Sequence, residues 1–188
     1  MGTGPLTPLL RFFERLAPLS SEERAAIEAS AVVRRFDEDE RLPVGTQTYF
    51  VLEGCVRQLH RTHDGAELTV GLFLEGQWIV DSTHELICLE ATTVVVGDDT
   101  KQAQLFAKFP RLESVARLTL QQVLAQANAA AAAHRTASPE ERYQSLSPAL
   151  LQRVPQYVLA SYLGVTPESL SRIRRRLATR ARGTSKPS

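Results

Sequence analysis

The sequence predicts an α+β protein in which an antiparallel β sandwich or barrel is followed by a helical C-terminal half. Between residues 32 and 97, short runs of β-branched and aromatic residues alternate with glycines, as in a sheet of short strands. From Lys101 onward the strand pattern stops. Residues 1–100 hold 8 basic and 17 acidic residues, whereas residues 101–188 hold 14 and 4, so the halves carry net charges of −9 and +10. This asymmetry indicates two tasks, with a polyanion as the partner of the second half.

The N-terminal region predicts helices before the first strand. Residues 18–31 suit a helix that Ser20 or Ser21 caps, because Glu22 and Glu23 then lie at its positive end. Residues 7–16 predict an earlier helical turn.

Five runs predict the strands, and one dipeptide predicts a hairpin. The runs are residues 32–36, 49–62, 67–76, 77–81 and 86–97. Asp64-Gly65 lies between two of them, and a two-residue hairpin turn of this composition requires positive φ at both positions.

The region after Lys101 predicts a long helix that Pro110 opens at its first turn and that runs to about His134. Leu112, Val115, Leu118 and Val123 give it an apolar side, and residues 129–133 are all alanine. One interpretation packs this helix on its own sheet. The other makes it a dimer helix, because small side chains let two backbones approach closely. A new helix start follows, with a cap, a first-turn proline and two acids at Ser138, Pro139, Glu140 and Glu141.

Residues 156–178 predict two short helices joined by a turn that contains glycine, the arrangement of a helix-turn-helix. Gly164 can end the first helix in the left-handed conformation, and Thr166 with Pro167 can begin the second. Ala160 is small where the helices cross. The predicted buried side is completed by Leu163, Val165, Leu170, Ile173 and Leu177.

The same spacing predicts which side chains face outward. These are Glu168, Ser169, Arg172, Arg175 and Arg176. Arginine can bind guanine through two hydrogen bonds and glutamate can accept one from cytosine, so this set suits the major groove of DNA. Residues 165–188 carry a net charge of +6, and Lys186 together with the later arginines would neutralise phosphates. The alternative is a solvated basic helix end, which would not require the cap, the glycine and the apolar triplet in register.

The motifs "YFVLEGCVR", "HDGAELTVGLFLEGQWIVD", "SPEERYQSL", "LLQRVPQ" and "YVLASYLGVTPESLSRIRRR" together resemble the Crp/Fnr family of bacterial transcription regulators over about residues 10–178. The resemblance implies a cyclic-nucleotide-binding-like β-roll, of the double-stranded β-helix or jelly-roll type, at residues 1–109. It also implies a central dimerisation helix at 110–136 and a winged-helix-like, helix-turn-helix DNA-binding domain at 137–188.

The resemblance implies how such a protein works. In the family, an acid near the start of the recognition helix and an arginine four residues later read bases, and these positions are Glu168 and Arg172 here. The expected DNA-binding set is Thr166, Glu168, Ser169, Arg172, Arg175 and Arg176. The expected partners are a second copy of the chain and double-stranded DNA with a palindromic operator, and RNA polymerase is a further candidate. The roll would be a sensor that alters the spacing of two recognition helices, or a vestigial scaffold.

One region departs from the family pattern. Cyclic-nucleotide-binding members hold the ligand with a glutamate and an arginine around a short helix, but only three residues separate Asp81 from Glu85 here. Residues 62–100 contain no lysine or arginine and eight acids: Asp64, Glu67, Glu75, Asp81, Glu85, Glu90, Asp98 and Asp99. A cyclic phosphate would therefore meet a negative field without a cation. We expect no cyclic nucleotide bound in the family manner; no cofactor is assigned, and the effector stays open.

Other classes of site are weaker. Cys55 and Cys88 are too few for an iron–sulfur cluster and are expected to be thiols rather than a disulfide. His60, His63 and Glu67 predict no metal site, because the histidines point to opposite faces of a strand. His84, near Cys88, is a candidate haem or redox ligand, but no other residue supports it. Trp78 could line a ligand pocket, but a single tryptophan between strands is more often part of the core.

Three functions remain in view. The sequence predicts a regulator and not an enzyme, with no catalytic or metal-binding residue. The alternatives are a ligand-independent DNA-binding and dimerisation module and, less favoured, a metal-dependent cupin-like barrel enzyme. The N-terminus lacks the pattern of a signal peptide and no apolar run could span a bilayer, so a cytoplasmic protein without a membrane partner is expected.

Overall fold

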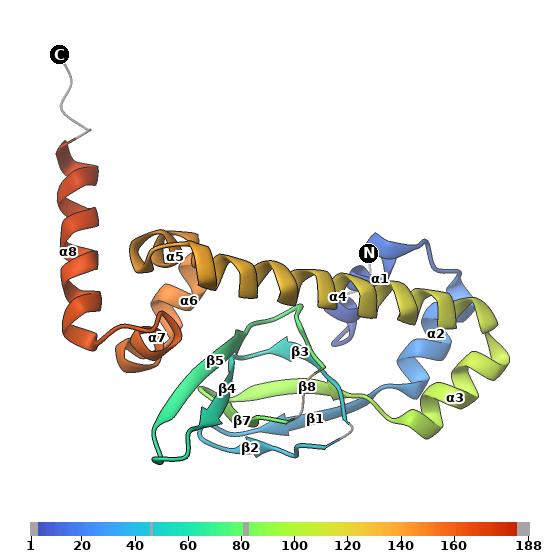
Figure 1. Ribbon diagram of the computed structural model, residues 1–188. Helices are drawn as coiled ribbons and strands as arrows, with labels where there is room; N and C mark the ends of the chain where they lie inside the picture. The colour runs from blue at the N-terminus through green and yellow to red at the C-terminus, as the bar shows by residue number, and fades with distance from the viewer. Residues whose placement is uncertain (1–3, 46, 81–82, 184–188) are drawn as a thin grey trace.

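The computed structural model describes residues 4–45, 47–80 and 83–183, and Asp81 and Lys186 of the sequence-based predictions lie outside them. Two helices, eight strands and six further helices follow one another along the described chain. The long helix α4 runs past the strands, with α1 to α3 near its start and α5 to α8 near its end (Figure 1). The predicted α+β class and the order of its parts are confirmed.

The N-terminal helices are α1 (Thr7–Leu16) and α2 (Ser21–Ser30). The strands are β1 (Val32–Phe36), β2 (Arg41–Leu42), β3 (Tyr49–Glu53), β4 (Val56–Arg61), β5 (Glu67–Phe73), β6 (Trp78–Ile79), β7 (Glu85–Cys88) and β8 (Thr92–Val96). The C-terminal helices are α3 (Asp99–Lys108), α4 (Pro110–Thr136), α5 (Pro139–Ser145), α6 (Pro148–Arg153), α7 (Gln156–Tyr162) and α8 (Pro167–Gly183).

The predicted helix boundaries are close but not the same. The helix expected over residues 18–31 begins at Ser21, because Ser20 caps it and exchanges hydrogen bonds with Glu23 in a capping box. Helix α4 begins at Pro110, as predicted, and extends two residues past His134. Its bounds match the predicted central segment, whereas the division of the chain into domains stays a prediction.

The strands form two four-stranded antiparallel sheets, in the orders β1-β8-β3-β6 and β2-β7-β4-β5. A core of side chains from both sheets fills the roll, with Tyr49, Val51, Val56 and Val94 fully buried. Strand β2 was not predicted, because its two residues are too short for an alternating pattern to show.

The predicted hairpin joins β4 to β5, but its turn differs from the prediction. The N–H of Thr62 donates to the carbonyl of Ala66 at 2.9 Å, so the loop contains three residues. Gly65 has a φ of +84°, whereas Asp64 does not have positive φ. Three-residue loops commonly place only their last residue in the left-handed region, and glycine occupies that place here.

A second glycine lets two turns of the roll approach closely. Gly54 joins β3 to β4 with a φ of +104°, and a Cβ atom there would lie 2.4 Å from Oγ1 of Thr92. Its N–H donates to the carboxylate of Glu75 at 3.0 Å. The close contact leaves no room for a side chain, so the position requires glycine.

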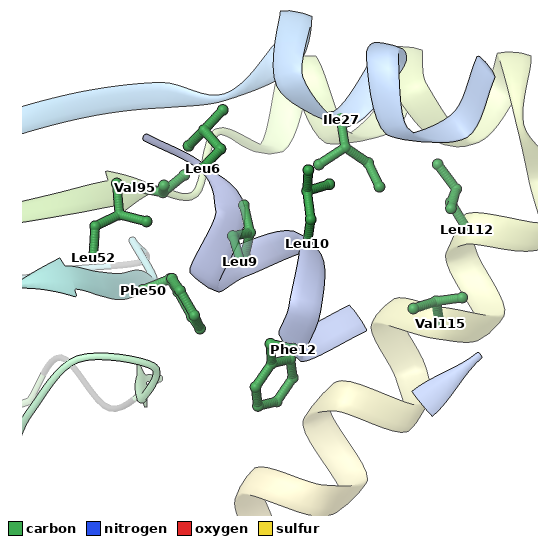
Figure 2. Packing of buried hydrophobic residues seen from close by; sticks show 10 residues of the cluster. All are labelled: Leu6, Leu9, Leu10, Phe12, Ile27, Phe50, Leu52, Val95, Leu112 and Val115. Carbon is green, nitrogen blue, oxygen red and sulfur yellow. The ribbon is translucent and has the colours of Figure 1, made fainter. Parts of the chain in front are cut away.

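The N-terminal helices and α4 cover the outer face of the β1-β8-β3-β6 sheet. Figure 2 shows this core, in which Leu9, Leu10 and Phe12 of α1 lie among side chains of the sheet, α2 and α4. The half-buried Trp78 packs its ring at 5.1 Å from that of Phe50 at the edge of this core, and it also lines a pocket, so both interpretations of this tryptophan hold in part. Arg111, in the first turn of α4, binds both carboxylate oxygens of Glu23 at 2.9 Å and so fixes α2 against α4.

Both cysteines are free and buried, as expected. Burial raises the pKa of the Cys55 thiol to about 12. Among the described residues, no helix is long and apolar enough to cross a membrane. The same residues contain no group of three or more His, Cys, Asp or Glu placed to hold a metal ion.

Candidate nucleic-acid interface

Helices α7 and α8 form the predicted helix-turn-helix. Gly164 has a φ of +64°, its N–H donates to Ser161 at 3.0 Å, and the N–H of Val165 donates to Ala160 at 2.9 Å. This pair of hydrogen bonds is the Schellman motif, which ends a helix with a left-handed residue. Thr166 then begins α8, because its Oγ1 accepts from the N–H of Ser169 at 3.2 Å. Each local role predicted for the turn is therefore present.

The inward side of the pair is apolar. Leu163 and Leu170 are fully buried, and Ala160 is 1% exposed where the helices cross. Ile173 is 6% exposed, whereas Leu177 is only half-buried. Burial of leucine side chains stabilises such a core by about 2 kcal/mol each, which fixes the rotation of α8 about its axis.

That rotation directs the predicted set outward. Glu168, Arg172, Arg175 and Arg176 are exposed and Ser169 is half-buried. Nη2 of Arg172 donates to Oγ of Ser169 at 2.9 Å, so these two side chains are already in contact. The backbone N–H of Glu168 itself, and then the Thr166 side chain, hold the pKa of this carboxylate below its usual value. Glu168 is therefore a hydrogen-bond acceptor at neutral pH.

The arginines of α8 do not all have the same surroundings. The guanidinium of Arg174 lies 5.7 Å from the centre of the Tyr143 ring, so this arginine packs α8 on α5 instead of facing outward. Arg176 and Arg180 both bind the carboxylate of Glu140, at 3.0 Å and 2.6 Å. Sequence reasoning placed Glu140 only as a first-turn acid of α5, because a pairing across 36 to 40 positions leaves no local pattern.

Arg142 of α5 connects the turn to the long helix. Its Nη2 donates to the carbonyl of Leu163 at 2.7 Å, and its Nη1 lies 2.7 Å from Nδ1 of His134 at the end of α4. The His134 ring also meets the Tyr162 ring edge to face at 5.2 Å. Loss of water around the imidazole, and then the charge of Arg142, hold the pKa of His134 below its ordinary value. The end of α4 therefore contacts α7 directly through Tyr162 and reaches the turn through Arg142.

The helix-turn-helix also packs directly on the roll. Cys55 and Leu72 of the roll share one buried core with Val154, Val158 and Leu159. The N–H of Thr69 on β5 donates to Oγ of Ser161 on α7 at 2.9 Å. The head of the molecule, defined here as α5 to α8, is thus held by the roll as well as by α4.

One arginine reinforces this contact. Arg153, the last residue of α6, binds Glu75 at 2.7 Å and Glu90 at a second, shorter contact. These two carboxylates belong to different turns of the roll. The ion pairs, which we call the Arg153 clamp, join the head to both turns at once.

Several acids of the roll form ion pairs with arginines that lie outside residues 62–100 in the sequence. Arg61 binds Glu67 and Glu85 at 2.8 and 2.7 Å, and the buried Arg57 lies 3.7 Å from Glu67. Arginines from outside residues 62–100 reach the acids of that segment in space, which a count of charge along the segment does not show. These arginines are already paired with the acids that they approach. The expectation that a cyclic phosphate would meet no cation there stays a prediction.

A groove of about 590 Å³ lies between β5, α4 and α7. Its walls are mainly apolar, with Leu68, Val70 and Ala127 among them, and Gln58 and His134 supply polar groups. Among the described residues that line it, none is lysine or arginine.

Helix α4 divides its apolar residues between two surroundings. Leu112 and Val115 are buried in the core over the sheet, as the first interpretation of this helix requires. Leu118, Leu120 and Leu124 are 38%, 49% and 50% exposed. Of the predicted apolar side, Leu112 and Val115 thus cover the chain's own core, Val123 is half-buried at the groove, and Leu118 is partly exposed. Leu120 and Leu124 were not part of that prediction.

No protein-family model matches the sequence, and no curated protein matches it significantly. Solved structures do resemble it. The c-di-GMP-responsive global regulator CLP of Xanthomonas campestris is 18% identical with a TM-score of 0.62, over 86% of this chain and 93% of that one. FixK2 of Bradyrhizobium japonicum is 20% identical with a TM-score of 0.62, over 80% and 86% of the two chains. A CooA mutant from Carboxydothermus hydrogenoformans is 14% identical with a TM-score of 0.63, over 95% and 86%. The chain therefore has the fold of the Crp/Fnr regulators.

Proposed function

We propose that this chain is a sequence-specific DNA-binding transcription regulator that acts as a homodimer. The observation that carries the proposal is the orientation of α8, whose buried side turns Glu168, Arg172 and Arg175 outward from a capped helix start. An α-helix of this kind fits the major groove, where such side chains distinguish base pairs. A regulator of this type works in the cytoplasm, and RNA polymerase is a candidate partner there.

Within this proposal the residues divide by role. Glu168 and Arg172 read base edges with Ser169, which Arg172 contacts. Thr166 and Arg175 are also exposed, and their hydrogen bonds and charge to phosphates would set the orientation of the helix. Arg176 also belongs to the DNA-binding set, although Glu140 holds it in the free protein.

The second copy would dock on the exposed leucines of α4. Leu120 and Leu124, four positions apart on one side of α4, are 49% and 50% exposed and form an apolar surface that the chain's own core does not cover. A dimer built on it would present two α8 helices to half-sites about one helical turn, roughly 34 Å, apart on DNA. Sedimentation of the full chain and of a Leu120→Glu/Leu124→Glu variant tests this, since the variant should sediment as a monomer.

Selection of bound DNA from a random pool tests the whole proposal. A palindrome with half-sites about ten base pairs apart is expected. On the selected site, Glu168→Ala and Arg172→Ala should each cost roughly 1–3 kcal/mol of binding free energy. The control is Glu28→Ala/Arg35→Ala, which removes the same two charges from an exposed surface elsewhere. If both α8 variants bind as tightly as the parent in the same salt, the base-reading roles are wrong.

The roll does not bind cyclic nucleotides in the family manner under this proposal. Supporting it, the groove beside β5 is lined by no described lysine or arginine, and the nearby Arg57, Arg61 and Arg153 already pair with acids. Calorimetry with cyclic AMP and cyclic GMP should show no micromolar binding.

A ligand-independent regulator is the second candidate, favoured by the contact of the head with both roll and α4. A metabolite extract that shifts the melting temperature or operator affinity would exclude it.

A further inference from the structure

Glu140 of α5 lies between two arginines of α8, which we call the reading helix because it carries the proposed base contacts. Its Oε2 is 3.0 Å from Nη2 of Arg176, and its Oε1 accepts a hydrogen bond from Nη1 of Arg180 at 2.6 Å. The side chain of Glu140 is 19% exposed, whereas those of Arg176 and Arg180 are 54% and 66% exposed. Each carboxylate oxygen therefore serves one guanidinium, and both guanidinium groups extend from the acid toward solvent.

The position of Glu140 is fixed from both sides. Ser138 and Glu141 form a capping box, which sets the first turn of α5 and with it the backbone of Glu140. Across the contact, Arg174 packs on the ring of Tyr143 and joins the middle of α8 to α5. Arg176 and Arg180 are four positions apart and so lie on one side of α8, facing this turn.

Two other arginines of α8 have different surroundings. Arg172 contacts Ser169, and within the described part of the chain Arg175 has no carboxylate at ion-pair distance. These two guanidinium groups can meet DNA without first leaving an acid. Arg176 and Arg180 would have to exchange Glu140 for a phosphate.

We propose that Glu140 withholds Arg176 and Arg180 from DNA phosphates and thereby lowers the non-specific affinity of the reading helix. This inference rests on the proposed DNA-binding function. Non-specific affinity depends on the number of phosphates that basic side chains neutralise, whereas base reading depends on groups at the other end of the exposed side. Glu140 is therefore a specificity-determining residue that need not touch the operator.

The first test replaces the carboxylate by an amide of the same shape. Glu140→Gln should bind a duplex of random sequence about tenfold more tightly at 0.1 M salt, and the plot of log affinity against log salt should steepen by about two for each bound protomer. Glu22→Gln is the matched control, because it removes the same charge from an exposed position on α2. The control should leave both quantities close to those of the parent.

The second test removes the arginines in both backgrounds. Arg176→Gln/Arg180→Gln should weaken binding of the random duplex by less than twofold when Glu140 is present. In the Glu140→Gln background the same pair should abolish the tenfold gain. Equal losses in both backgrounds, or a Glu140→Gln variant that behaves as Glu22→Gln does, would overturn the proposal. Circular dichroism melting confirms that each variant is folded.

A heparin column separates this inference from the proposed function. Heparin is a polyanion without nucleobases, so it binds basic side chains but offers no sequence to read. Later elution of Glu140→Gln than of the parent therefore reports release of the arginines, whether or not an operator exists. If Glu140→Gln elutes later but no DNA sequence is selected, the proposed regulator function is wrong, whereas the role of Glu140 in holding the two arginines is supported. A selected operator with unshifted elution of Glu140→Gln would contradict the role of Glu140 alone.

Discussion

The guanidinium of Arg142 donates a 2.7 Å hydrogen bond to the carbonyl oxygen of Leu163, the residue that ends α7. This bond supplies a partner to a carbonyl at the helix end, where intrahelical donors are missing. The same side chain reaches His134, so one arginine sets the distance between the end of α4 and the turn before α8.

Replacement of Arg142 should therefore loosen the helix-turn-helix. We expect Arg142→Gln to lower the free energy of unfolding by about 1–3 kcal/mol, the usual cost of losing a hydrogen bond from a charged group. Urea unfolding followed by circular dichroism measures it. Arg135→Gln is the control, since this neighbouring arginine is exposed at the end of α4. Equal midpoints for the two variants would show that the bond to Leu163 contributes nothing.

His134 should make stability depend on pH. Its folded pKa lies below the ordinary value because the ring is partly desolvated and the charge of Arg142 is close. The unfolded chain therefore binds the proton more readily, so stability is complete above about pH 6.5 and falls as the pH drops through the folded pKa. His134→Gln should remove this part of the decline. Thermal melting of the parent and the variant between pH 7.5 and 5 checks it. If the melting temperatures of the two proteins fall in parallel with pH, the histidine is not the cause of the decline.

Gly164 should tolerate asparagine better than alanine. A Cβ atom at this position would lie 4.0 Å from Arg142, so there is room for a side chain and the cost comes from the backbone at a φ of +64°. We expect Gly164→Ala to destabilise by about 1–2 kcal/mol and Gly164→Asn by less, because asparagine adopts left-handed conformations more readily. Chemical denaturation of the two variants measures the difference. An asparagine variant less stable than the alanine variant would contradict this account.

The Arg153 clamp should matter most near neutral pH. Burial favours the neutral form of Glu75, but the hydrogen bond from Arg153, those from backbone N–H groups and the charge of Arg153 together outweigh it and hold the pKa of Glu75 below its usual value. The contribution is thus present above about pH 4.5 and lost as the carboxylate is protonated. Because the groups are partly exposed, Arg153→Met should cost only about 1 kcal/mol at pH 7.

Acid unfolding provides the check on the clamp. The gap between parent and Arg153→Met should narrow as the pH falls from 7 toward 4. Arg61→Met, which removes an arginine bound to acids within the roll, is the comparison. A gap that stays constant with pH would assign the cost to lost packing of the side chain instead of to the ion pairs.

Most of the local structure could be predicted from the sequence. Capping at Ser20 and Ser138, the first-turn prolines and the turn at Gly164 are each determined by neighbours within five positions. The buried and exposed sides of α8 followed from helical spacing alone. These features share a short range, over which residue type and backbone geometry are directly linked.

The missed features involve distant partners. Glu140 with Arg180, Arg153 with Glu75, and Thr69 with Ser161 pair across 40, 78 and 92 positions. Strand β2 is held by its pairing with β7 and not by its own two residues. Counting charge along a segment misses such pairs for the same reason, since an acid is neutralised by what approaches it in space.

The thiol of Cys55, buried in the core between the roll and the head, can report whether these two parts of the molecule separate. This thiol is 1% exposed and has a pKa of about 12, so it is inert to alkylating reagents while α6 and α7 cover it. Lifting of the head would expose it to solvent and remove the burial that suppresses its thiolate. The alkylation rate of Cys55 therefore measures how often head and roll separate, and it can be followed with DNA or a metabolite present.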